Sequence, residues 1–404
     1  MNIVLFTHPD FIGSQSMPRF ARGLADAFRE RGHSVDVRAP RAWTRAFFRS
    51  GSLAKWAGYI DQYLIFPWEI RFAIRRDPKE TLYVFCDQAL GPWMPLVAHR
   101  PHVVHCHDLL ALRSALGDIP ENRTSLTGRI YQSYIRRGFQ KAKYFISISK
   151  KSRADLHRFG KVSPVVSEVV YNGLNFAYHP LSRPDAADRL RQAGLPADPR
   201  GILLHVGGNQ WYKNAEGVIR MYAEYAVRET APLPLVMVSP SPTSRMLAEL
   251  NRVPAKGSVT FASGLDNQTL QAAYSYAKAL IFPSLAEGFG WPIIEALACG
   301  CAVITTDEPP MTEVGGSAVH YVPRLKAAEH LQEWASVAVK ELMNVLARDE
   351  QTCIRESSEG IIWAARFDPA RTIEAYLEVY EKVMQLASGR ENRSSSSSRQ
   401  GQAT

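Results

Sequence analysis

The most informative segment of the chain runs Ile281-Phe-Pro-Ser-Leu-Ala-Glu-Gly-Phe-Gly-Trp-Pro-Ile-Ile-Glu-Ala-Leu-Ala-Cys-Gly300. Its apolar start predicts a strand that ends at Pro283, and a glycine-containing loop follows. Pro292 suits the first position of a helix, and Gly300 suits the cap at the C-terminal end of that helix. A strand, a loop and a helix in this order form the repeating unit of an open parallel α/β sheet.

Two glutamates flank the glycine loop. Glu287 lies within the loop and Glu295 in the first turn of the predicted helix, so both can face one ligand. The amides of Gly288, Phe289 and Gly290 lie at the helix N-terminus, where a phosphate is favoured. Carboxylates repel phosphate but accept hydrogen bonds from sugar hydroxyls. We therefore expect a ligand with hydroxyls around a diphosphate, such as a nucleotide sugar.

The alternation of strands and helices extends over most of the chain, in two similar halves. A second series of strands starts with residues 201–206, and a helix begins near Asn214. The sequence therefore predicts two doubly wound α/β domains, with mostly helical chain after about residue 325. The expected strands cover residues 3–7, 34–38, 82–86, 102–105, 144–148, 165–170, 201–206, 233–238, 259–261, 279–283 and 301–306.

The composition excludes several classes of protein. With 46% hydrophobic and 22% charged residues, the 404-residue chain is typical of a soluble globular protein rather than a disordered, collagen-like or coiled-coil one. Its five cysteines include no C-x-x-C pair, which excludes a disulfide scaffold and a zinc ribbon and suits a reducing cytoplasm. We find no signal peptide and no apolar run of about 18 residues, so we expect a cytoplasmic protein. The net charge of +9 indicates an anionic partner, such as nucleotide phosphates, lipid headgroups or nucleic acid.

The segment 281–300 resembles the Glu-x7-Glu signature of the retaining nucleotide-sugar glycosyltransferases of family 4. That family has the GT-B architecture, in which two Rossmann-like domains face each other across a cleft. The resemblance covers nearly the whole chain, because shorter motifs are also similar to the family pattern. These are Leu-His-Val-Gly-Gly-Asn-Gln-Trp-Tyr-Lys-Asn at 204–214, Val-Tyr-Asn-Gly at 170–173, Ile-Ser-Ile-Ser at 146–149 and the stretch 301–316.

The resemblance implies a role for each matched residue. Glu287 would contact hydroxyls of the donor sugar, Glu295 the nucleotide ribose, and Lys213 the donor diphosphate. Negative charge builds on the leaving diphosphate as the glycosidic bond breaks, and a lysine together with a helix N-terminus can stabilise it. The chain contains no Asp-x-Asp, which metal-dependent sugar transferases need. We therefore expect no metal ion and no cofactor, with the nucleotide sugar as a substrate.

The chain departs from the family pattern in two loops. The family usually has an arginine shortly before the lysine, but here Gly208, Asn209 and Gln210 occupy that loop. The dipoles of Asn209 or Gln210, or an arginine from elsewhere such as Arg19, would then meet the phosphate charge. The N-terminal loop usually carries paired glycines, but here it has only Gly13, which we expect near the donor phosphate or the acceptor.

His107 is the remaining candidate for a catalytic role. It follows a predicted strand, and strand ends face the cleft in such folds. Family members often place a histidine here, close to the reacting sugar. His105 and His107 share one face of the strand and could instead bind a metal, but no further spaced ligands are evident. Retention without a dedicated nucleophile suggests front-side attack, in which a donor phosphate oxygen takes the acceptor proton.

The resemblance also implies a domain plan. We expect an acceptor-side domain at residues 1–183 and a nucleotide-sugar domain at residues 184–365. A helix at residues 366–387 would cross back to the first domain. The serine-rich tail at residues 388–404 is too polar to bury itself, so we expect it to be disordered.

Residues 41–76 combine basic and aromatic side chains. Seven basic residues against Asp61 and Glu69 give this segment +5 of the chain's net charge. Segments of this kind lie in membrane interfaces, so we expect contact with an anionic membrane surface. The alternative is an exposed helix pair whose aromatic residues fill the domain core. The basic residues are Arg41, Arg45, Arg49, Lys55, Arg71, Arg75 and Arg76, and the aromatic ones are Trp43, Phe47, Phe48, Trp56, Tyr59, Tyr63, Phe66 and Trp68.

Together these features predict a retaining glycosyltransferase of bacterial surface polysaccharide assembly, with a glycan or polyprenyl-linked acceptor. GDP-mannose, UDP-glucose and UDP-N-acetylglucosamine all fit as donors. Two alternatives stay open: a nucleotide-sugar-binding protein without transfer activity, because the diphosphate loop departs from the pattern, and a basic peripheral membrane protein. No recognised nucleic-acid module is present, so we expect no nucleic-acid partner.

Overall fold

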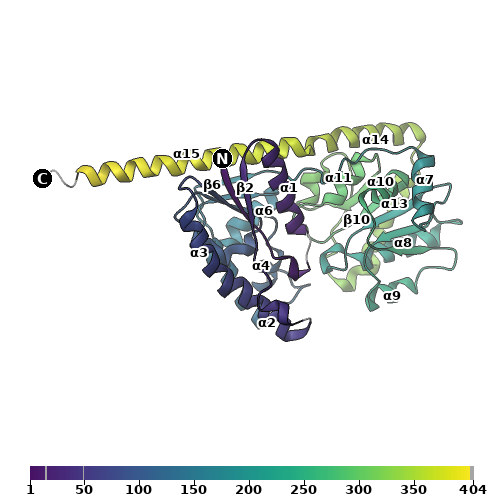
Figure 1. Ribbon diagram of the computed structural model, residues 1–404. Helices are drawn as coiled ribbons and strands as arrows, with labels where there is room; N and C mark the ends of the chain where they lie inside the picture. Colours follow the sequence, from purple (N-terminus) through teal and green to yellow (C-terminus); the bar gives the residue numbers. More distant parts are fainter. Residues whose placement is uncertain (14–15, 49, 401–404) are drawn as a thin grey trace. The chain divides into compact units, whose positions relative to one another are not determined.

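The computed structural model describes residues 1–13, 16–48 and 50–400 and divides the chain into two compact units (Figure 1). The first unit comprises Met1–Tyr171 and the chain from Ala370 onward, and the second comprises Asn172–Pro369. Within the described residues, each unit contains a six-stranded sheet whose neighbouring strands are parallel. Parallel strands need crossover connections, and helices supply them here. The predicted pair of doubly wound α/β domains is confirmed.

The sheet of the first unit has the strand order β2-β1-β3-β4-β5-β6 and is buried on both faces. Successive side chains of β1 alternate, so that Val4 and Phe6 join the core on one face and Leu5 the core on the other. Burial on both faces explains why β1, β3 and β5 are almost continuously apolar, whereas the edge strands β2 and β6 include Asp36 and Glu168. The strands are β1 (Asn2–Phe6), β2 (Ser34–Arg38), β3 (Leu82–Phe85), β4 (His102–Cys106), β5 (Tyr144–Ser147) and β6 (Val166–Val169).

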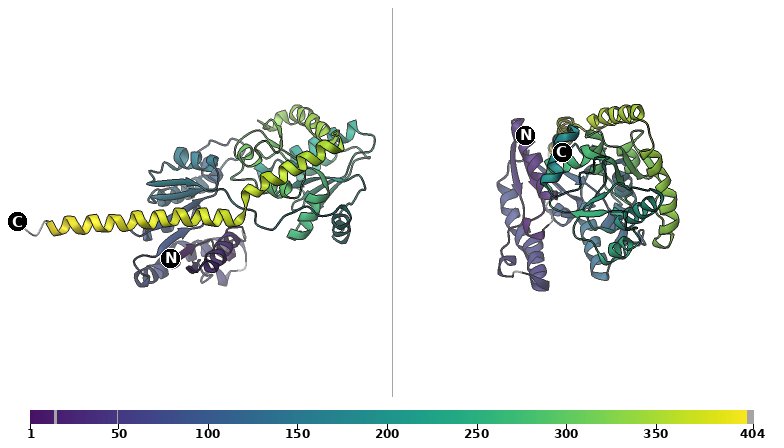
Figure 2. Two further views of the ribbon diagram at one scale, coloured as in Figure 1. Left: turned by 90° about the horizontal axis from the view of Figure 1, so that it is seen from above. Right: turned by 90° about the vertical axis from the view of Figure 1, so that its right-hand side faces the viewer.

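Helices α3, η4 and α5 supply the core on one face of this sheet, and helices α1 and α15 supply it on the other. Figure 2 shows α15 as one long helix, and its Tyr380 packs edge-on against Phe28 of α1. The helices are α1 (Ser16–Glu30), α2 (Gly51–Ile60), α3 (Phe66–Arg76), the 3-10 helix η4 (Gln88–Leu96), α4 (Leu110–Ala115), α5 (Leu126–Phe139), α6 (Lys150–Asp155) and α15 (Pro369–Gln400).

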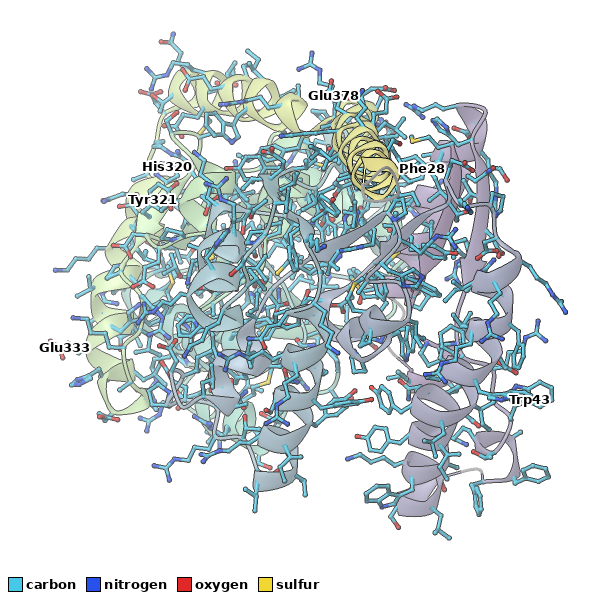
Figure 3. The ribbon with its side chains drawn as sticks, turned by 90° about the vertical axis from the view of Figure 1, so that its left-hand side faces the viewer. Phe28, Trp43, His320, Tyr321, Glu333 and Glu378 are labelled. Atoms are coloured by element: carbon cyan, nitrogen blue, oxygen red, sulfur yellow. The ribbon has the colours of Figure 1, made fainter. Side chains whose placement is uncertain are left out.

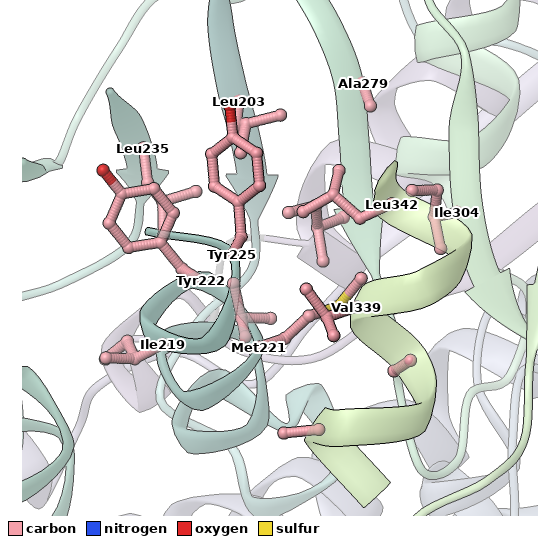
Figure 4. Close-up of a cluster of buried hydrophobic side chains, with 14 of the residues drawn as sticks. Leu203, Ile219, Met221, Tyr222, Tyr225, Leu235, Ala279, Ile304, Val339 and Leu342 are labelled. Carbon is pink, nitrogen blue, oxygen red and sulfur yellow. The ribbon is translucent and has the colours of Figure 1, made fainter. Parts of the chain in front are cut away.

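The sheet of the second unit has the strand order β12-β11-β10-β7-β8-β9. A core of apolar side chains from these strands and from helices α8 and α13 lies against one face, with Leu203, Tyr222 and Leu342 among its members (Figure 4). The strands are β7 (Ile202–Val206), β8 (Leu235–Val238), β9 (Val259–Ala262), β10 (Ala277–Phe282), β11 (Val303–Thr306) and β12 (His320–Val322). The helices are α7 (Arg183–Gln192), α8 (Ala215–Arg228), α9 (Ser244–Leu250), α10 (Asn267–Tyr276), α11 (Trp291–Ala298), α12 (Met311–Gly315), α13 (Leu331–Leu346) and α14 (Glu350–Ala364).

The boundary between the units differs from the expected one at residue 184. Residues 172–183 belong to the second unit, because their backbone polar groups find partners there. The Leu174 amide donates to the Phe367 carbonyl at 2.9 Å, and the Gly173 carbonyl accepts from the indole Nε1 of Trp291 at 3.1 Å. A short irregular segment carries no pattern of its own, so its partners could not be predicted from the sequence.

The C-terminal segment also differs from expectation, because α15 continues as a helix to Gln400 where the sequence predicts a disordered tail from residue 388. Residues 390–400 contain neither glycine nor proline. The segment therefore lacks the two strong helix breakers, and once a helix has started each added residue gains a hydrogen bond. The last part of the predicted tail, residues 401–404, lies outside the described residues.

Candidate functional site

The candidate site of the second unit lies where β7 and β10 end. These strands are parallel neighbours, with Leu204 opposite Leu280, so the loops that follow them come together at one edge of the sheet. The Leu285 amide of the β10 loop donates to the Tyr212 carbonyl of the β7 loop at 2.7 Å. The Asn214 side chain donates to the Pro283 carbonyl at 3.1 Å. These two bonds hold the two loops together. They lie at the carboxyl ends of the strands, where open α/β sheets bind ligands.

Lys213 and Glu287 meet in these two loops and form an ion pair. The Lys213 Nζ lies 2.7 Å from the Glu287 Oε1, and both side chains are largely buried. The ammonium also lies 5.0 Å from the centre of the Phe282 ring, within the range of a cation–π contact. A buried pair keeps both charges in place only when geometry and partners are good. The structure therefore brings together the two residues that the sequence assigns to the diphosphate and the sugar.

Glu295 does not lie as predicted. Because α11 begins at Trp291, Glu295 falls in the second turn of the helix rather than the first, and its side chain is only 5% exposed. Its Oε2 accepts a hydrogen bond from the Tyr274 hydroxyl at 2.8 Å. Burial raises the pKa of Glu295 to about 7, although hydrogen bonds from Tyr274 and Asn175 and the charge of Lys213 oppose the shift. The carboxyl group is thus buried and bonded to Tyr274, while the charge of Lys213 still acts on it.

The glycine loop before α11 leads directly into the N-terminus of that helix. Gly290 caps the helix with a φ of 105°, a left-handed conformation that costs energy for any residue with a side chain. Phe289 is buried between the rings of Trp291 and Phe367, each with its centre 5.9 Å away, so it anchors the loop by packing. The peptide groups from Gly288 onward therefore lead into the positive end of the α11 dipole.

The loop after β7 lacks the family's arginine, and the structure shows what its residues do instead. The Asn209 side chain donates to the Ser241 carbonyl at 2.9 Å, which ties this loop to the one after β8. Gly208 lies against Gln210: a Cβ at Gly208 would fall 2.3 Å from the Gln210 Oε1. Arg19 belongs to the first unit, where it is exposed on α1.

Arg324 is a site residue that sequence reasoning missed. It follows β12, and its Nε donates to the Leu285 carbonyl, in the loop after β10, at 2.8 Å. Its Nε also lies 3.8 Å from the Glu308 carboxylate. The position at a strand's carboxyl end was the available signal, but the strand β12 itself was not predicted.

In the first unit, His107 directly follows β4 and lies at the carboxyl ends of the strands. Its Nε2 lies 2.9 Å from the Cys86 carbonyl, and its own carbonyl accepts from the Ser152 hydroxyl at 2.8 Å. Its ring is buried and meets Phe20 edge-on at 4.9 Å. Burial lowers the pKa of His107, although the charge of Asp87 opposes the shift. These contacts fix the His107 ring at the carboxyl end of β4, and its catalytic role stays a prediction.

A second pair that the sequence did not suggest lies at the same edge. His8 follows β1 and Asp87 follows β3, and the His8 Nε2 lies 2.9 Å from the Asp87 Oδ2. Burial by itself raises the pKa of Asp87, but hydrogen bonds from His8 and from the Ala89 amide hold it below its usual range. Both residues come directly after strands, so the rule that singled out His107 applies to them too. Gly13, in the same loop as His8, adopts a φ of 83° next to residues 14–15, which lie outside the described residues.

In the part of the chain that the structure describes, no group of three or more His, Cys, Asp and Glu side chains is placed to hold a metal ion. In the same residues, no helix is both long enough and apolar enough to cross a bilayer.

Two family models match this chain. The model described as glycosyl transferases group 1 matches residues 187–338, and the model described as glycosyltransferase family 4 matches residues 17–178. The first match lies in the second unit and contains the Lys213–Glu287 pair.

Similar curated proteins include two mannosyltransferases of Escherichia coli. O-antigen chain mannosyltransferase B is 23% identical over 57% of this chain and 62% of its own length. Serotype-specific mannosyltransferase WbdA is 24% identical over 69% of this chain, but over only 33% of its own length. D-inositol 3-phosphate glycosyltransferase of Jonesia denitrificans is 26% identical over 71% of this chain and 68% of its own length. The match thus spans less than two thirds of both mannosyltransferases.

Solved structures resemble the whole chain. Sucrose-phosphate synthase from Thermosynechococcus elongatus superposes with a TM-score of 0.69 at 17% identity and covers 96% of this chain and 100% of its own. Anabaena HepE in complex with UDP and glucose superposes with a TM-score of 0.68 at 16% identity, over 95% of this chain and 100% of its own. At this identity the likeness concerns the fold.

Proposed function

Since this chain belongs to glycosyltransferase family 4 and has the GT-B fold, we propose that it is a retaining glycosyltransferase. It would move a sugar from a nucleoside-diphosphate donor to a glycan or lipid-linked acceptor. The observation that carries this proposal is the Lys213–Glu287 ion pair at 2.7 Å, held at the loop that leads into α11.

The pair combines the two charges that a nucleotide sugar needs. The Lys213 ammonium would share its charge with the donor diphosphate, and the N-terminus of α11 would add its dipole. Glu287 would then accept hydrogen bonds from hydroxyls of the sugar. As the glycosidic bond breaks, charge grows on the leaving diphosphate, where a fixed cation stabilises it most. This arrangement needs no metal ion, and we propose that the reaction uses none.

Retention follows from the family resemblance. The acceptor hydroxyl would attack on the face of the leaving group, and a phosphate oxygen of the donor would take its proton. The contact of Glu295 with the nucleotide ribose stays a prediction. A ribose would have to reach a carboxyl group that already accepts a hydrogen bond from Tyr274.

The names of the relatives support two classes of donor. The E. coli relatives are mannosyltransferases of O-antigen chains, which favours GDP-mannose and a role in bacterial surface polysaccharide assembly. HepE was solved with UDP and glucose, which favours a UDP-sugar.

A direct test is to incubate the purified chain with GDP-mannose, UDP-glucose and UDP-N-acetylglucosamine, with water taking the sugar in place of the acceptor, and to measure release of the nucleoside diphosphate. We expect release from one of them and its loss in Glu287→Gln. The missing loop arginine favours a second candidate, a nucleotide-sugar-binding protein without transfer activity. Calorimetry that detects binding without any release would support that candidate and contradict ours.

We further propose that the chain binds an anionic membrane surface peripherally, on the cytoplasmic side, through residues 41–76. Of the aromatic residues in this segment, only Phe66 is fully buried in the core, while Tyr59 and Tyr63 are half-buried, so most of these residues do not fill the core. Phe47 and Trp56 are exposed by 85% and 66%, and Trp43 projects from the edge of the unit (Figure 3). Flotation with vesicles of phosphatidylglycerol tests this. Binding should weaken as salt rises and should be absent with phosphatidylcholine vesicles.

A further inference from the structure

A cavity of about 520 Å³ lies within the first unit, outside the donor site. It is bounded by the turn η1 (Asp10–Ile12) after β1, by α2, and by α5. Among its lining residues, all in the described part of the chain, two are cationic and none is acidic. The residues that matter here are Phe11, Arg45, Lys55, Tyr59 and Tyr131.

The walls of the cavity are aromatic and held in place. The rings of Tyr59 and Tyr131 are 5.7 Å apart, and the hydroxyls of Tyr63 and Tyr131 lie 2.5 Å apart. Phe11 packs directly on α2 at Gly58, where a Cβ would fall 3.2 Å from the ring. A wall of this kind suits a hydrocarbon chain. A purely polar ligand would not need it.

The two cations are positioned at the same cavity. The Lys55 Nζ lies 5.9 Å from the centre of the Tyr59 ring. The Asp61 carboxylate, which is buried, accepts from the Arg45 amide at 2.9 Å and from the Thr44 hydroxyl at 2.8 Å. Asp61, one of the two acids of residues 41–76, therefore fixes the turn that carries Arg45, and the Arg45 guanidinium itself donates to the Phe48 carbonyl. The charge presented to the cavity is positive.

The cavity and the exposed apolar face belong to neighbouring sides of one helical segment. Helix α2, the π-helical turn η3 (Asp61–Ile65) and α3 follow each other without a break (Figure 1). Leu53, Trp56 and Ile60 are exposed on one side, while Ala54, Gly58 and Gln62 line the cavity on the adjacent side. A molecule embedded in a membrane under the exposed side would find the cavity directly beside it.

The cavity also adjoins the edge of the sheet. Phe11 and Ile12, which line the cavity, belong to the turn η1 that follows the carboxyl end of β1. One end of the cavity thus leads toward the carboxyl ends of the strands, where open α/β sheets bind their ligands.

We propose that this cavity binds the phosphate and the first hydrocarbon units of a lipid-linked acceptor. Arg45 and Lys55 would bind the phosphate, and Phe11, Tyr59 and Tyr131 would contact the chain. The proposal rests on the proposed glycosyltransferase function and deepens it, because it selects the lipid-linked class over a free glycan.

Calorimetric titration of the full chain with farnesyl diphosphate tests the proposal. We expect the Arg45→Gln, Lys55→Gln double variant to lose affinity at least about tenfold, because charge-assisted contacts to phosphate are lost. The matched control is Arg129→Gln, Arg137→Gln, which removes two exposed cations from α5 outside the cavity and should bind within about twofold of the unmodified chain. Farnesol and inorganic pyrophosphate should each bind more weakly than farnesyl diphosphate.

Three results would overturn the proposal. Equal affinity of the double variant and the control for farnesyl diphosphate would show that Arg45 and Lys55 do not bind its phosphates. Loss of binding in Lys213→Met would place the probe at the donor loop instead. Equally tight binding of dihexanoyl-phosphatidylglycerol, lost in the double variant, would identify a general phospholipid headgroup site. Donor release is measured separately, so a chain that binds farnesyl diphosphate in the cavity but releases no nucleotide contradicts the proposed function alone.

Discussion

Replacing Glu295 with glutamine should stabilise the second unit in a pH-dependent way. The carboxyl group is buried, and burial raises its pKa from 4.5 to about 7. In the unfolded chain the same group titrates near 4.5. Glutamine keeps an oxygen that can accept the hydrogen bond from Tyr274, but it has no charge to bury.

The direction in which stability changes with pH follows from the number of protons that the folded and the unfolded chain bind. Between pH 4.5 and about 7, the unfolded chain releases this proton while the folded unit keeps it. Stability therefore falls as the pH rises through this range and levels off above about pH 7. The difference between the folded and the unfolded pKa corresponds to about 3 kcal/mol of unfolding free energy, because each pH unit is worth about 1.4 kcal/mol. The substitution removes this loss, so its benefit should be near zero at pH 4.5 and largest above pH 7.

Scanning calorimetry at pH 5, 6, 7 and 8 measures the effect. In a unit of this size about 3 kcal/mol shifts the melting temperature by roughly 6–12 °C, so the Glu295→Gln variant should melt that much higher at pH 8 and within about 3 °C at pH 5. Glu359→Gln, on the exposed side of α14, is the matched control and should follow the unmodified chain at every pH. Parallel pH curves for the Glu295→Gln variant and the unmodified chain would refute the reasoning.

Three further predictions concern the donor loops and the exposed face. Lys213→Met should weaken GDP or UDP binding about 10–100-fold in calorimetric titration, because a charged contact to phosphate is worth about 1.5–3 kcal/mol. Gly290→Ala should cost about 1–2 kcal/mol in thermal unfolding, since its φ is 105° and a Cβ would lie 3.2 Å from Ile293. Leu53→Ala with Trp56→Ala should reduce flotation with phosphatidylglycerol vesicles at least about tenfold, because both side chains are exposed and apolar.

Each of these has a matched control. Lys278→Met removes an exposed lysine from the other end of β10 and should leave nucleotide binding unchanged. Gly23→Ala, inside α1 with open space around it, should not destabilise the chain. Leu247→Ala removes an exposed leucine from the second unit and should not alter flotation. A control that behaves like its test variant would contradict the corresponding prediction.

Much of the architecture was predictable because it rests on local signals. Short apolar runs separated by helical spacing indicate parallel strands whatever the rest of the chain does. Pro292 and Gly300 indicate the two ends of α11 through their own backbone preferences, and the helix covers Trp291–Ala298, so it starts one residue before Pro292. Lys213 and Glu287 were identified by motif, and they meet because the strands before them are neighbours in one sheet.

The tertiary structure decided which polar residues are buried and what they contact. Glu295 was expected in the first turn of α11, but the helix starts at Trp291, and the Glu295 carboxylate accepts a hydrogen bond from Tyr274. His8 and Asp87 are far apart in the sequence and pair only because β1 and β3 are adjacent.

The same holds for the segment at residues 41–76. Its composition indicates a basic and aromatic surface, but only packing shows that Asp61 is buried while Trp56 is exposed. The physical reason is that a strand or a helix follows from the preferences of residues close in sequence. The exposure and the partners of a side chain depend instead on segments that fold against it from elsewhere in the chain.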